Sequence, residues 1–242
     1  MSNYCTQKCK VLDHSLSQQC AEVMAKSFLN SPVYKFLFAD CKDENERLTS
    51  LIWFFERRLK MILKKCPSAL RGIVDYDNDK TPKVIACFLW YEQSLEDFTT
   101  WDMIQVGLWE IPIRFGFNTL KRMMDFVRII EKEKESFYEK YDIEERSNAK
   151  DRKVVRYMLN HMVVRTEFQG KGIGSSALKQ TFLEYDQEDV PAELWLYTQE
   201  KKNVTFYSRL GFEVVHEKAY SDSGSDETES YDFHQWTMKK ML

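Results

Sequence analysis

The spacing of apolar residues begins with a helical period. Ser17 to Asp40 carries apolar residues three or four positions apart, and the interruption at Ser31-Pro32 predicts one helix followed by a short second turn. Asp43 to Lys65 has the same spacing with charged residues between the apolar ones, which predicts an amphipathic helix. Cys66-Pro67 should end this helix, because a residue before proline avoids helical backbone angles.

The period then shortens to that of strands. Leu70 to Tyr76 and Lys83 to Tyr91 are short and rich in Val, Ile, Cys and aromatic residues, and turn formers lie between them. They predict a hairpin. Residues 94–150 return to helical spacing, with a break at Ile111-Pro112 and a charged, projecting end over Glu131 to Arg146. We expect two or three helices here, which either brace the sheet or wall a substrate pocket.

The last third alternates between the two periods. The predicted strands are Val155 to Arg165, Ala192 to Thr198, Phe212 to Ala219 and His234 to Lys239. The predicted helices are Gly174 to Asp186 and Asn203 to Leu210, the second ended by Gly211. Ser221 to Ser230 contains no hydrophobic residue and predicts a flexible hairpin loop.

Composition is that of one ordinary globular domain over residues 1–242, with 43% hydrophobic and 14% aromatic residues. A net charge of -3 provides no basic field, so we expect no nucleic-acid partner. The start resembles no signal peptide and no apolar stretch is long enough to span a membrane. All 6 cysteines lie in the first third, without paired CxxC spacing, so reduced thiols in a cytoplasmic protein are expected, and no metal.

Three of the chain's 8 glycines lie in Gln169-Gly170-Lys171-Gly172-Ile173-Gly174, between a predicted strand and a predicted helix. Glycine lets backbone N–H groups approach an anion, and a helix N-terminus adds partial positive charge, so a pyrophosphate fits. A Walker loop is disfavoured because the chain has no GxxxxGK followed by Ser or Thr. A Rossmann fingerprint is disfavoured because Ser175 stands where its last glycine belongs. A tight turn without a ligand is the remaining alternative.

The glycine string also resembles a family signature. Gln169-x-x-Gly172-x-Gly174 is similar to the Q/R-x-x-G-x-G/A motif of GNAT N-acetyltransferases, and the preceding strand ends Met162-Val163-Val164 as theirs do. Asn203 to Phe212 resembles the family's N-x-x-F-Y-x-x-x-G-F segment. The C-terminal half, closing on Trp236-Thr237-Met238, is similar to puromycin-type and other small-molecule N-acetyltransferases. The resemblance covers Arg156 to Leu242 clearly, the first 91 residues by element order only, and the insertion barely.

The resemblance implies an α+β GNAT fold, in which a mixed, mostly antiparallel sheet splays between two parallel strands and is flanked by helices. The 94–150 insertion precedes the cofactor-binding strand, and residues 154–242 form the acetyl-CoA-binding half. The pantetheine of acetyl-CoA would lie between the strands that end at Val164 and Thr198. The implied cofactor contacts are Met162, Val163, Val164, Gln169, Gly170, Lys171, Gly172, Ile173, Gly174, Ser175, Asn203 and Tyr207.

Roles within the site follow from the same resemblance. The Met162 backbone amide would stabilise charge developing on the acetyl carbonyl oxygen. Tyr207 is the implied acid, because a phenol can donate to the departing thiolate; a core tyrosine is the alternative. Asn203 is expected to cap its helix and touch the cofactor. Strand alternation places Asn160 on the face of Met162, as an acceptor contact, and His161 on the opposite face as a packed histidine.

The general base is not assigned. Some family members place a glutamate near the start of this strand, where this chain has Met158, and Glu110 or an ordered water could serve instead. Direct attack by the acceptor is favoured over a covalent cysteine intermediate at Cys87, because a fully buried thiol is usually inert.

The expected function is transfer of an acetyl group from acetyl-CoA to a primary amine of a small molecule, by a monomer or homodimer. A protein lysine or N-terminal acetyltransferase and a noncatalytic coenzyme A-binding module are the alternatives. A deep pocket closed by Trp101 to Phe126 would favour small acceptors, and an open groove would favour peptides.

Overall fold

The computed structural model describes residues 7–76, 81–148, 154–186, 190–222 and 231–242, and the side chains of these except at 133–148, 222 and 231. Most of the predicted loop from Ser221 to Ser230 therefore lies outside the described residues. Its first two positions belong to a strand.

Within the described ranges, seven strands form one sheet in the order β1-β2-β3-β4-β5-β7-β6. The strands are β1 (Lys10–Val11), β2 (Leu70–Tyr76), β3 (Pro82–Glu92), β4 (Val155–Val164), β5 (Ala192–Thr198), β6 (Glu213–Asp222) and β7 (Tyr231–Met241). All neighbours pair antiparallel except β4 and β5, which are parallel. The predicted mixed, mostly antiparallel sheet is confirmed, and the short β1 is an addition that the apolar pattern did not indicate.

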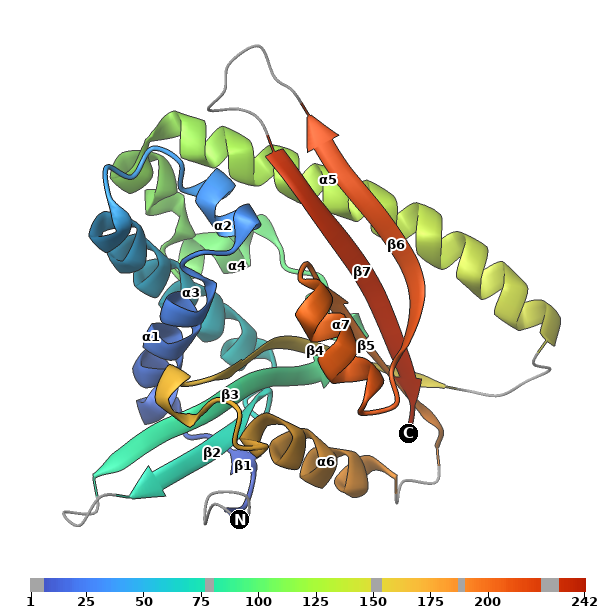
Figure 1. The fold of residues 1–242 in the computed structure, drawn as a ribbon. Helices are drawn as coiled ribbons and strands as arrows, with labels where there is room; N and C mark the ends of the chain where they lie inside the picture. The colour runs from blue at the N-terminus through green and yellow to red at the C-terminus, as the bar shows by residue number, and fades with distance from the viewer. Residues whose placement is uncertain (1–6, 77–80, 149–153, 187–189, 223–230) are drawn as a thin grey trace.

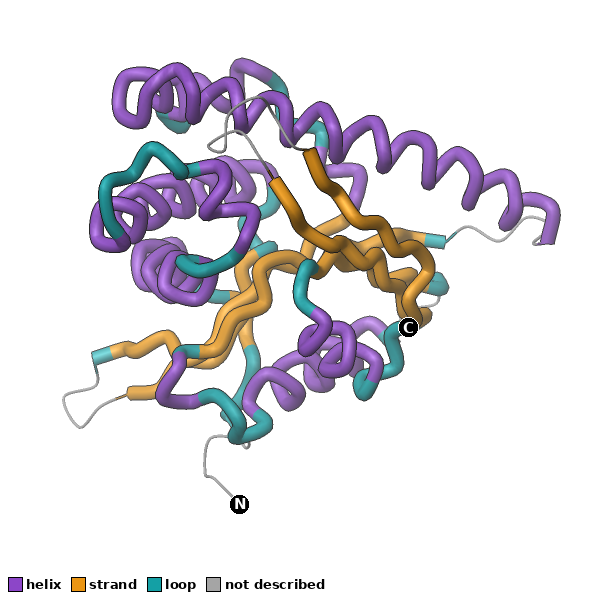
Figure 2. The backbone as a smooth tube through the Cα atoms, turned by 45° about the horizontal axis from the view of Figure 1, so that its top comes forward, coloured by secondary structure: helices purple, strands orange, loops and turns teal. Residues whose placement is uncertain are grey.

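Helices cover both faces of this sheet (Figures 1 and 2). One face carries α1 (Ser17–Phe28), α2 (Pro32–Leu37), α3 (Glu44–Lys65) and α5 (Ile111–Asn148), and the other carries α6 (Ile173–Tyr185) and α7 (Lys201–Ser208). The short helices are α4 (Thr100–Gln105), η2 (His14–Leu16), η3 (Gln93–Glu96), η4 (Leu108–Glu110) and η5 (Thr166–Phe168). Each face has its own apolar core, which allows side chains of adjacent strand residues to enter different environments.

Local chemistry explains α3, whose predicted bounds are confirmed. The Asp43 side chain accepts a hydrogen bond from the Glu46 amide at 2.8 Å and caps the helix start. Lys64 and Lys65 occupy the last turn, where positive charge favours the helix C-terminus. Cys66 is the C-cap, as expected of a residue before proline.

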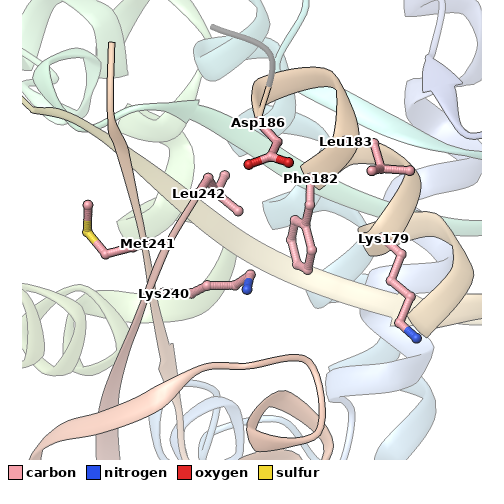
Figure 3. Close-up of a pocket in the computed structure, with 7 residues that line it drawn as sticks. All are labelled: Lys179, Phe182, Leu183, Asp186, Lys240, Met241 and Leu242. Carbon is pink, nitrogen blue, oxygen red and sulfur yellow. The ribbon is translucent and has the colours of Figure 1, made fainter. Parts of the chain in front are cut away.

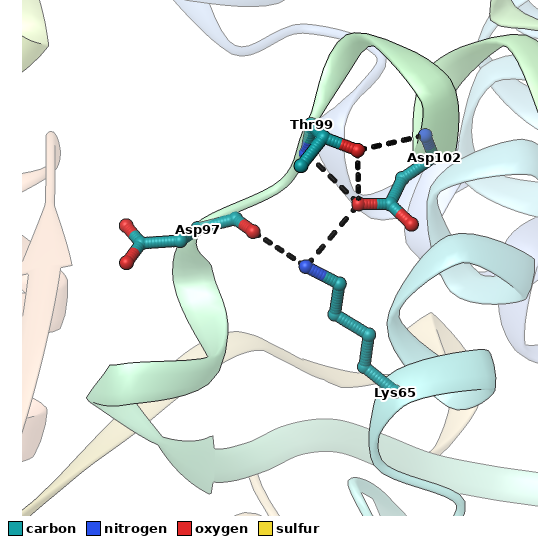
Figure 4. Close-up of polar contacts among 4 residues, drawn as sticks. All are labelled: Lys65, Asp97, Thr99 and Asp102. Atoms are coloured by element: carbon teal, nitrogen blue, oxygen red, sulfur yellow. Dashed lines mark hydrogen bonds and ion pairs between the residues drawn. The ribbon is translucent and has the colours of Figure 1, made fainter.

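The insertion contains helices, as predicted, and two polar anchors join it to the body. At its start, Lys65 donates to the Asp97 carbonyl and pairs with Asp102, which forms a capping box with Thr99 (Figure 4). Further on, the Arg122 guanidinium donates to Asp40 at 2.6 Å. These contacts fix α4 and the first half of α5 against α3 and the end of α2.

The long helix α5 is interrupted at a different place from the expected one. Pro112 lies in its first turn, where a missing N–H costs nothing, so Ile111-Pro112 marks the start of the helix. The interruption is at Gly116, with φ 83° and ψ 164°. The helix ends well beyond the β6–β7 arm, which confirms that the charged segment projects (Figure 1).

Candidate active site

An irregularity in β4 lies at the centre of the sheet. Leu89 pairs with Asn160 and Cys87 with Val163, so two residues of β4, His161 and Met162, stand opposite the single residue between Cys87 and Leu89. His161 has a φ of 53°, a left-handed backbone conformation that residues other than glycine rarely adopt. This is a β-bulge, which disrupts the ladder and re-aims side chains.

The same stretch of β4 separates from its other neighbour. The parallel ladder with β5 runs from Val155 opposite Ala192 to Met158 opposite Trp195. Beyond that point β5 pairs with β7 through Thr198, while β4 continues through the bulge to Val164. The two strands therefore splay, and the ladder leaves 160–164 without a β5 partner. An unpaired strand edge can bind an extended molecule by backbone hydrogen bonds.

The glycine loop follows directly after the splayed segment. Gly170 and Gly172 have φ of 71° and 76°, which glycine adopts without strain. Gly172 is the N-cap of α6 and provides no side-chain cap, and the first helical bond runs from Ser176 to the Gly172 carbonyl at 2.9 Å. The intrahelical ladder therefore leaves the amides of 173–175 unpaired. With the helix dipole they suit an anion.

Two contacts hold this loop against β4. The Gln169 side chain donates to the Val164 carbonyl at 2.9 Å. A Cβ on Gly174 would lie 3.1 Å from Met162 Cε and 3.4 Å from Val164 Cγ2, so the third glycine lets α6 approach the strand closely. Lys171 donates to the Glu167 carbonyl at 2.9 Å.

Tyr207 lies near this junction, on α7. Its ring packs against Phe206 and Phe212 in the core on the α6 face, and burial raises its pKa above the ordinary value. No hydrogen bond to its hydroxyl is formed by the part of the chain that the structure describes. Phe206 reaches Gly174, where a Cβ would be 3.5 Å from Phe206 Cζ. Helix α7 thus lies beside the start of α6.

The prediction for Asn203 as a helix cap is wrong. Helix α7 begins at Lys201 and its N-cap is Glu200, whose carbonyl accepts from the Asn203 amide at 2.9 Å. Asn203 is therefore inside the first turn. The extended Glu200 lets helical angles begin two residues earlier than the motif indicated.

The predicted faces of Asn160, His161 and Met162 are also wrong. Asn160 donates to the Tyr91 hydroxyl at 2.8 Å, and His161 Nε2 lies 3.2 Å from the Tyr34 hydroxyl, so both belong to the α1–α3 face. Met162 lies on the opposite face beside Gly174. The bulge is the reason, because an inserted residue cancels the two-residue alternation. His161 is packed, as predicted, with Phe28 and Phe55 edge-on to its ring.

A polar cluster therefore lies on the α1–α3 side of the bulge, formed by Tyr34, Arg58, Tyr91, Glu96, Asn160 and His161. Tyr91 accepts from Asn160 and donates to Glu96 Oε1 at 3.2 Å, and burial raises its pKa. Burial raises the pKa of Tyr34 to about 12 and lowers that of His161 to about 3, so His161 is neutral at neutral pH.

Sequence reasoning missed most of this cluster. Tyr34, Arg58, Tyr91 and Glu96 come from α2, α3, β3 and η3, and no spacing in the sequence relates them. Glu110, weighed as a base, instead accepts from Arg114 at 2.6 Å within the insertion.

A small hollow lies where the insertion meets the sheet. Phe36, Phe126 and Phe233 line a hollow of about 10 Å³ between α2, α5 and β7, room for at most one water molecule. A larger cavity of about 320 Å³ lies at the far end of α6, where Lys179, Phe182, Leu183, Asp186, Lys240, Met241 and Leu242 line it (Figure 3). It is distant along α6 from the glycine loop. Neither hollow is a pocket closed by Trp101 to Phe126.

Comparison with known families agrees with the motif and the geometry. Residues 142–214 match the family model described as "Acetyltransferase (GNAT) domain". This range contains β4, the glycine loop, α6, β5 and α7. The part of the chain that contains the glycine loop is therefore similar to GNAT acetyltransferases, over less than half of the chain's length.

Solved structures with the same fold cover nearly the whole chain. Arylalkylamine N-acetyltransferase 2 from Aedes aegypti has a TM-score of 0.59 at 13% identity, over 97% of this chain and 98% of that one. A polyamine N-acetyltransferase from Drosophila melanogaster has 0.52 at 9%, over 97% and 99%. A structure described as histone acetyltransferase HPA2 and related acetyltransferase, from Corynebacterium glutamicum, has 0.52 at 14%, over 95% and 94%. These likenesses establish the fold.

One curated relative is much longer than this chain. It is described as a probable serine/threonine-protein kinase of Dictyostelium discoideum and is 23% identical over 205 residues, which are 81% of this chain and 20% of the relative. The chain thus spans about a fifth of that protein's length. Among the described residues, no helix is both long and apolar enough to cross a membrane.

Proposed function

We propose that this protein transfers the acetyl group of acetyl-CoA directly to a primary amine of a small molecule. The observation that carries the proposal is the junction of the splayed, bulged β4 with the N-terminus of α6, held together at Gly174. Its residues fit an acylated pantetheine and its pyrophosphate: an open strand edge accepts an extended chain, and uncapped amides accept an anion.

The binding residues divide by the part of the cofactor they would hold. The backbone of Met162, Val163 and Val164 would bind the pantetheine along the edge of β4. Residues 169–175 would bind the pyrophosphate through their amides, and Lys171 would add positive charge. Asn203 and Tyr207 would close the site from α7. Acetyl-CoA supplies the acetyl group already activated as a thioester.

The chain's own groups would act at two atoms. The Met162 amide, at the bulge, would donate to the acetyl oxygen as negative charge develops there, which is the largest effect available to such a site. Tyr207 would donate a hydrogen bond to the departing sulfur. Its raised pKa means that the phenol remains protonated at neutral pH but is a weaker acid than the thiol that forms, so stabilisation of the thiolate precedes any full proton transfer.

The acceptor would approach from the α1–α3 face, where the polar cluster adjoins the bulge and Asn160 would contact it. Cys87 does not suit a covalent route, since it is fully buried and its neighbour Cys20 and burial raise its pKa well above the ordinary value. Two proteins of this fold are named as arylalkylamine and polyamine N-acetyltransferases, which supports a small amine as acceptor.

Thiol release from acetyl-CoA with a panel of small amines and short peptides tests the proposal. We expect release that depends on a small amine and exceeds the rate without acceptor. Calorimetry with acetyl-CoA alone tests the binding half. Binding without acceptor-dependent release would leave a coenzyme A-binding module, and release with peptides alone would replace the small-molecule acceptor with a protein.

A further inference from the structure

Arg58 on α3 has a buried Nε atom with no hydrogen-bond partner among the described residues. No described carboxylate forms an ion pair with it, although most arginines of the body do so, as Arg122 does with Asp40 and Arg156 with Glu193. A partly buried guanidinium without a counter-charge opposes folding. A ligand that carries a negative charge would pair with this guanidinium and offset the cost of burying it.

The position of Arg58 relates it to the bulge. Arg58 lies one turn of α3 beyond Phe55, whose ring packs edge-on against His161 at 5.4 Å. Consistent with this position, its positive charge offsets part of the rise in the pKa of Tyr34 and Tyr91 and adds to the lowering of the pKa of His161. His161 Nδ1 is likewise buried and has no partner in the described part of the chain. Two unsatisfied polar groups therefore face the side of β4 from which an acceptor would reach the bulge.

The cluster holds one charge of each sign. Glu96, half-buried on η3, accepts the hydrogen bond from Tyr91, and Arg58 acts on that same tyrosine from α3. The rings of Phe28, Tyr34 and Phe55 pack around His161. A cation and an anion on apolar walls complement a small molecule that carries both an ammonium and a carboxylate.

We propose that Arg58 binds a carboxylate of the acceptor, so that the acceptor is an amino acid and not a simple amine. This inference rests on the proposed function and specifies its substrate class. The planar guanidinium matches a carboxylate with two parallel hydrogen bonds, a geometry that lysine does not provide. Glu96 would attract the ammonium group before it loses its proton for the attack.

Matched acceptor pairs that differ only in the carboxylate test the proposal: phenylalanine and phenethylamine, ornithine and putrescine, leucine and isoamylamine. We expect the wild-type protein to prefer the amino acid in kcat/KM by about tenfold or more, as the loss of one buried charge pair implies. Equal or better turnover of the decarboxylated amines would overturn the assignment of Arg58 and leave the acetyltransferase function standing.

Variants localise the effect. Arg58→Met should lower kcat/KM for the amino acids by about 30-fold and leave the decarboxylated amines unchanged, and Arg58→Lys should fall between. Arg57→Met is the matched control, because Arg57 is the adjacent arginine and its guanidinium lies 5.1 Å from the Trp53 ring centroid. An equal loss with both members of each pair would indicate a structural role and refute the proposal. An equal or higher Tm is expected in Arg58→Met, since no protein partner is lost and an unpaired, partly buried charge is removed.

A binding measurement keeps the two proposals separable. In the presence of coenzyme A, N-acetylphenylalanine should bind about tenfold or more tightly than N-acetylphenethylamine, and Arg58→Met should remove the difference. This preference requires no turnover, so it supports Arg58 even if no amine releases thiol, an outcome that would overturn the proposed reaction. Equal affinities would refute the role of Arg58 regardless of turnover.

Discussion

The two faces of β4 present different kinds of chemical group, backbone on one side and side chains on the other. On the α6 side, the candidate cofactor site consists of main chain: a bulge, a splayed strand edge, three glycines and the amides that begin a helix. On the α1–α3 side, the polar cluster consists of side chains that five separate elements contribute. The cofactor would thus be recognised by backbone and the acceptor by side chains.

This contrast suggests how one fold can keep a cofactor while its acceptor changes. Backbone groups are the same whatever the residue, so a main-chain site tolerates sequence change wherever φ and close packing are preserved. A side-chain cluster depends on each residue identity, and a single substitution can alter its charge. Substitutions on the two faces should therefore have separable effects on cofactor binding and on acceptor choice.

The largest effect is expected on the main-chain side, from Gly174→Val. A Cβ at this position would already lie 3.1 Å from Met162 Cε, so the branched side chain should push α6 away from β4. We expect turnover to fall by about 100-fold, corresponding to about 3 kcal/mol of misplacement. Kinetics of thiol release and calorimetry with acetyl-CoA measure it. The control is Leu183→Ala, at a residue that is 62% exposed on the same helix. Equal losses of turnover in both variants would contradict the explanation by displacement of α6.

Tyr207→Phe should have the next largest effect. Removal of a hydrogen bond to the leaving thiolate should lower kcat by about 30-fold, while acetyl-CoA affinity and Tm stay the same because the hydroxyl bonds to no described residue. Since burial raises the pKa of Tyr207, the wild-type activity should show no loss from tyrosine ionisation up to pH 10. Tyr76→Phe, on the distant hairpin, is the control. Unchanged kcat at neutral pH would exclude the role in leaving-group stabilisation.

On the α1–α3 side, the polar cluster should make the stability of the protein depend on pH. Burial lowers the pKa of His161 from 6.5 to about 3. Below pH 6.5 this histidine therefore binds a proton in the unfolded chain but stays neutral in the native protein. Stability from this group is present above pH 6.5 and is lost as pH falls, by about 1.4 kcal/mol per unit, or about 2 kcal/mol at pH 5. Urea unfolding at pH 7 and pH 5 measures it. His161→Phe should remove this part of the slope, whereas His14→Gln should retain it.

The smallest effect is expected from the anchor of the insertion. Thr99→Ala removes half of the capping box that Figure 4 shows and should cost about 1 kcal/mol, which lowers Tm by about 2–4 °C in a chain of this size. Turnover should be unaffected, since the Thr99 side chain forms its hydrogen bonds with Asp102 and not with the polar cluster. The neighbouring Thr100→Ala is the control in a thermal melt. A large loss of activity in Thr99→Ala would show that the capping box also helps to position Glu96 in the acceptor site.

Much of the fold was predictable because most elements follow from local pattern. The spacing of apolar residues indicated α3 and the hairpin of β2 and β3, and the bounds were nearly those observed. The two-residue strand β1 escaped because it is too short to carry a period. Helix α7 begins two residues before its predicted start, because no local pattern in the sequence indicates that Glu200 is extended and caps the helix.

For the candidate site, the glycine loop and its place between a strand and a helix could be predicted from sequence, because glycine is favoured wherever the backbone takes positive φ or approaches another group closely. The bulge at His161, which places Asn160 and Met162 on opposite faces, could not be predicted from local pattern. The same holds for the approach of Arg58 and Glu96 to Tyr91. The physical reason is range: backbone conformation is encoded over a few neighbouring residues, whereas contacts between elements arise when the sheet and its two cores assemble.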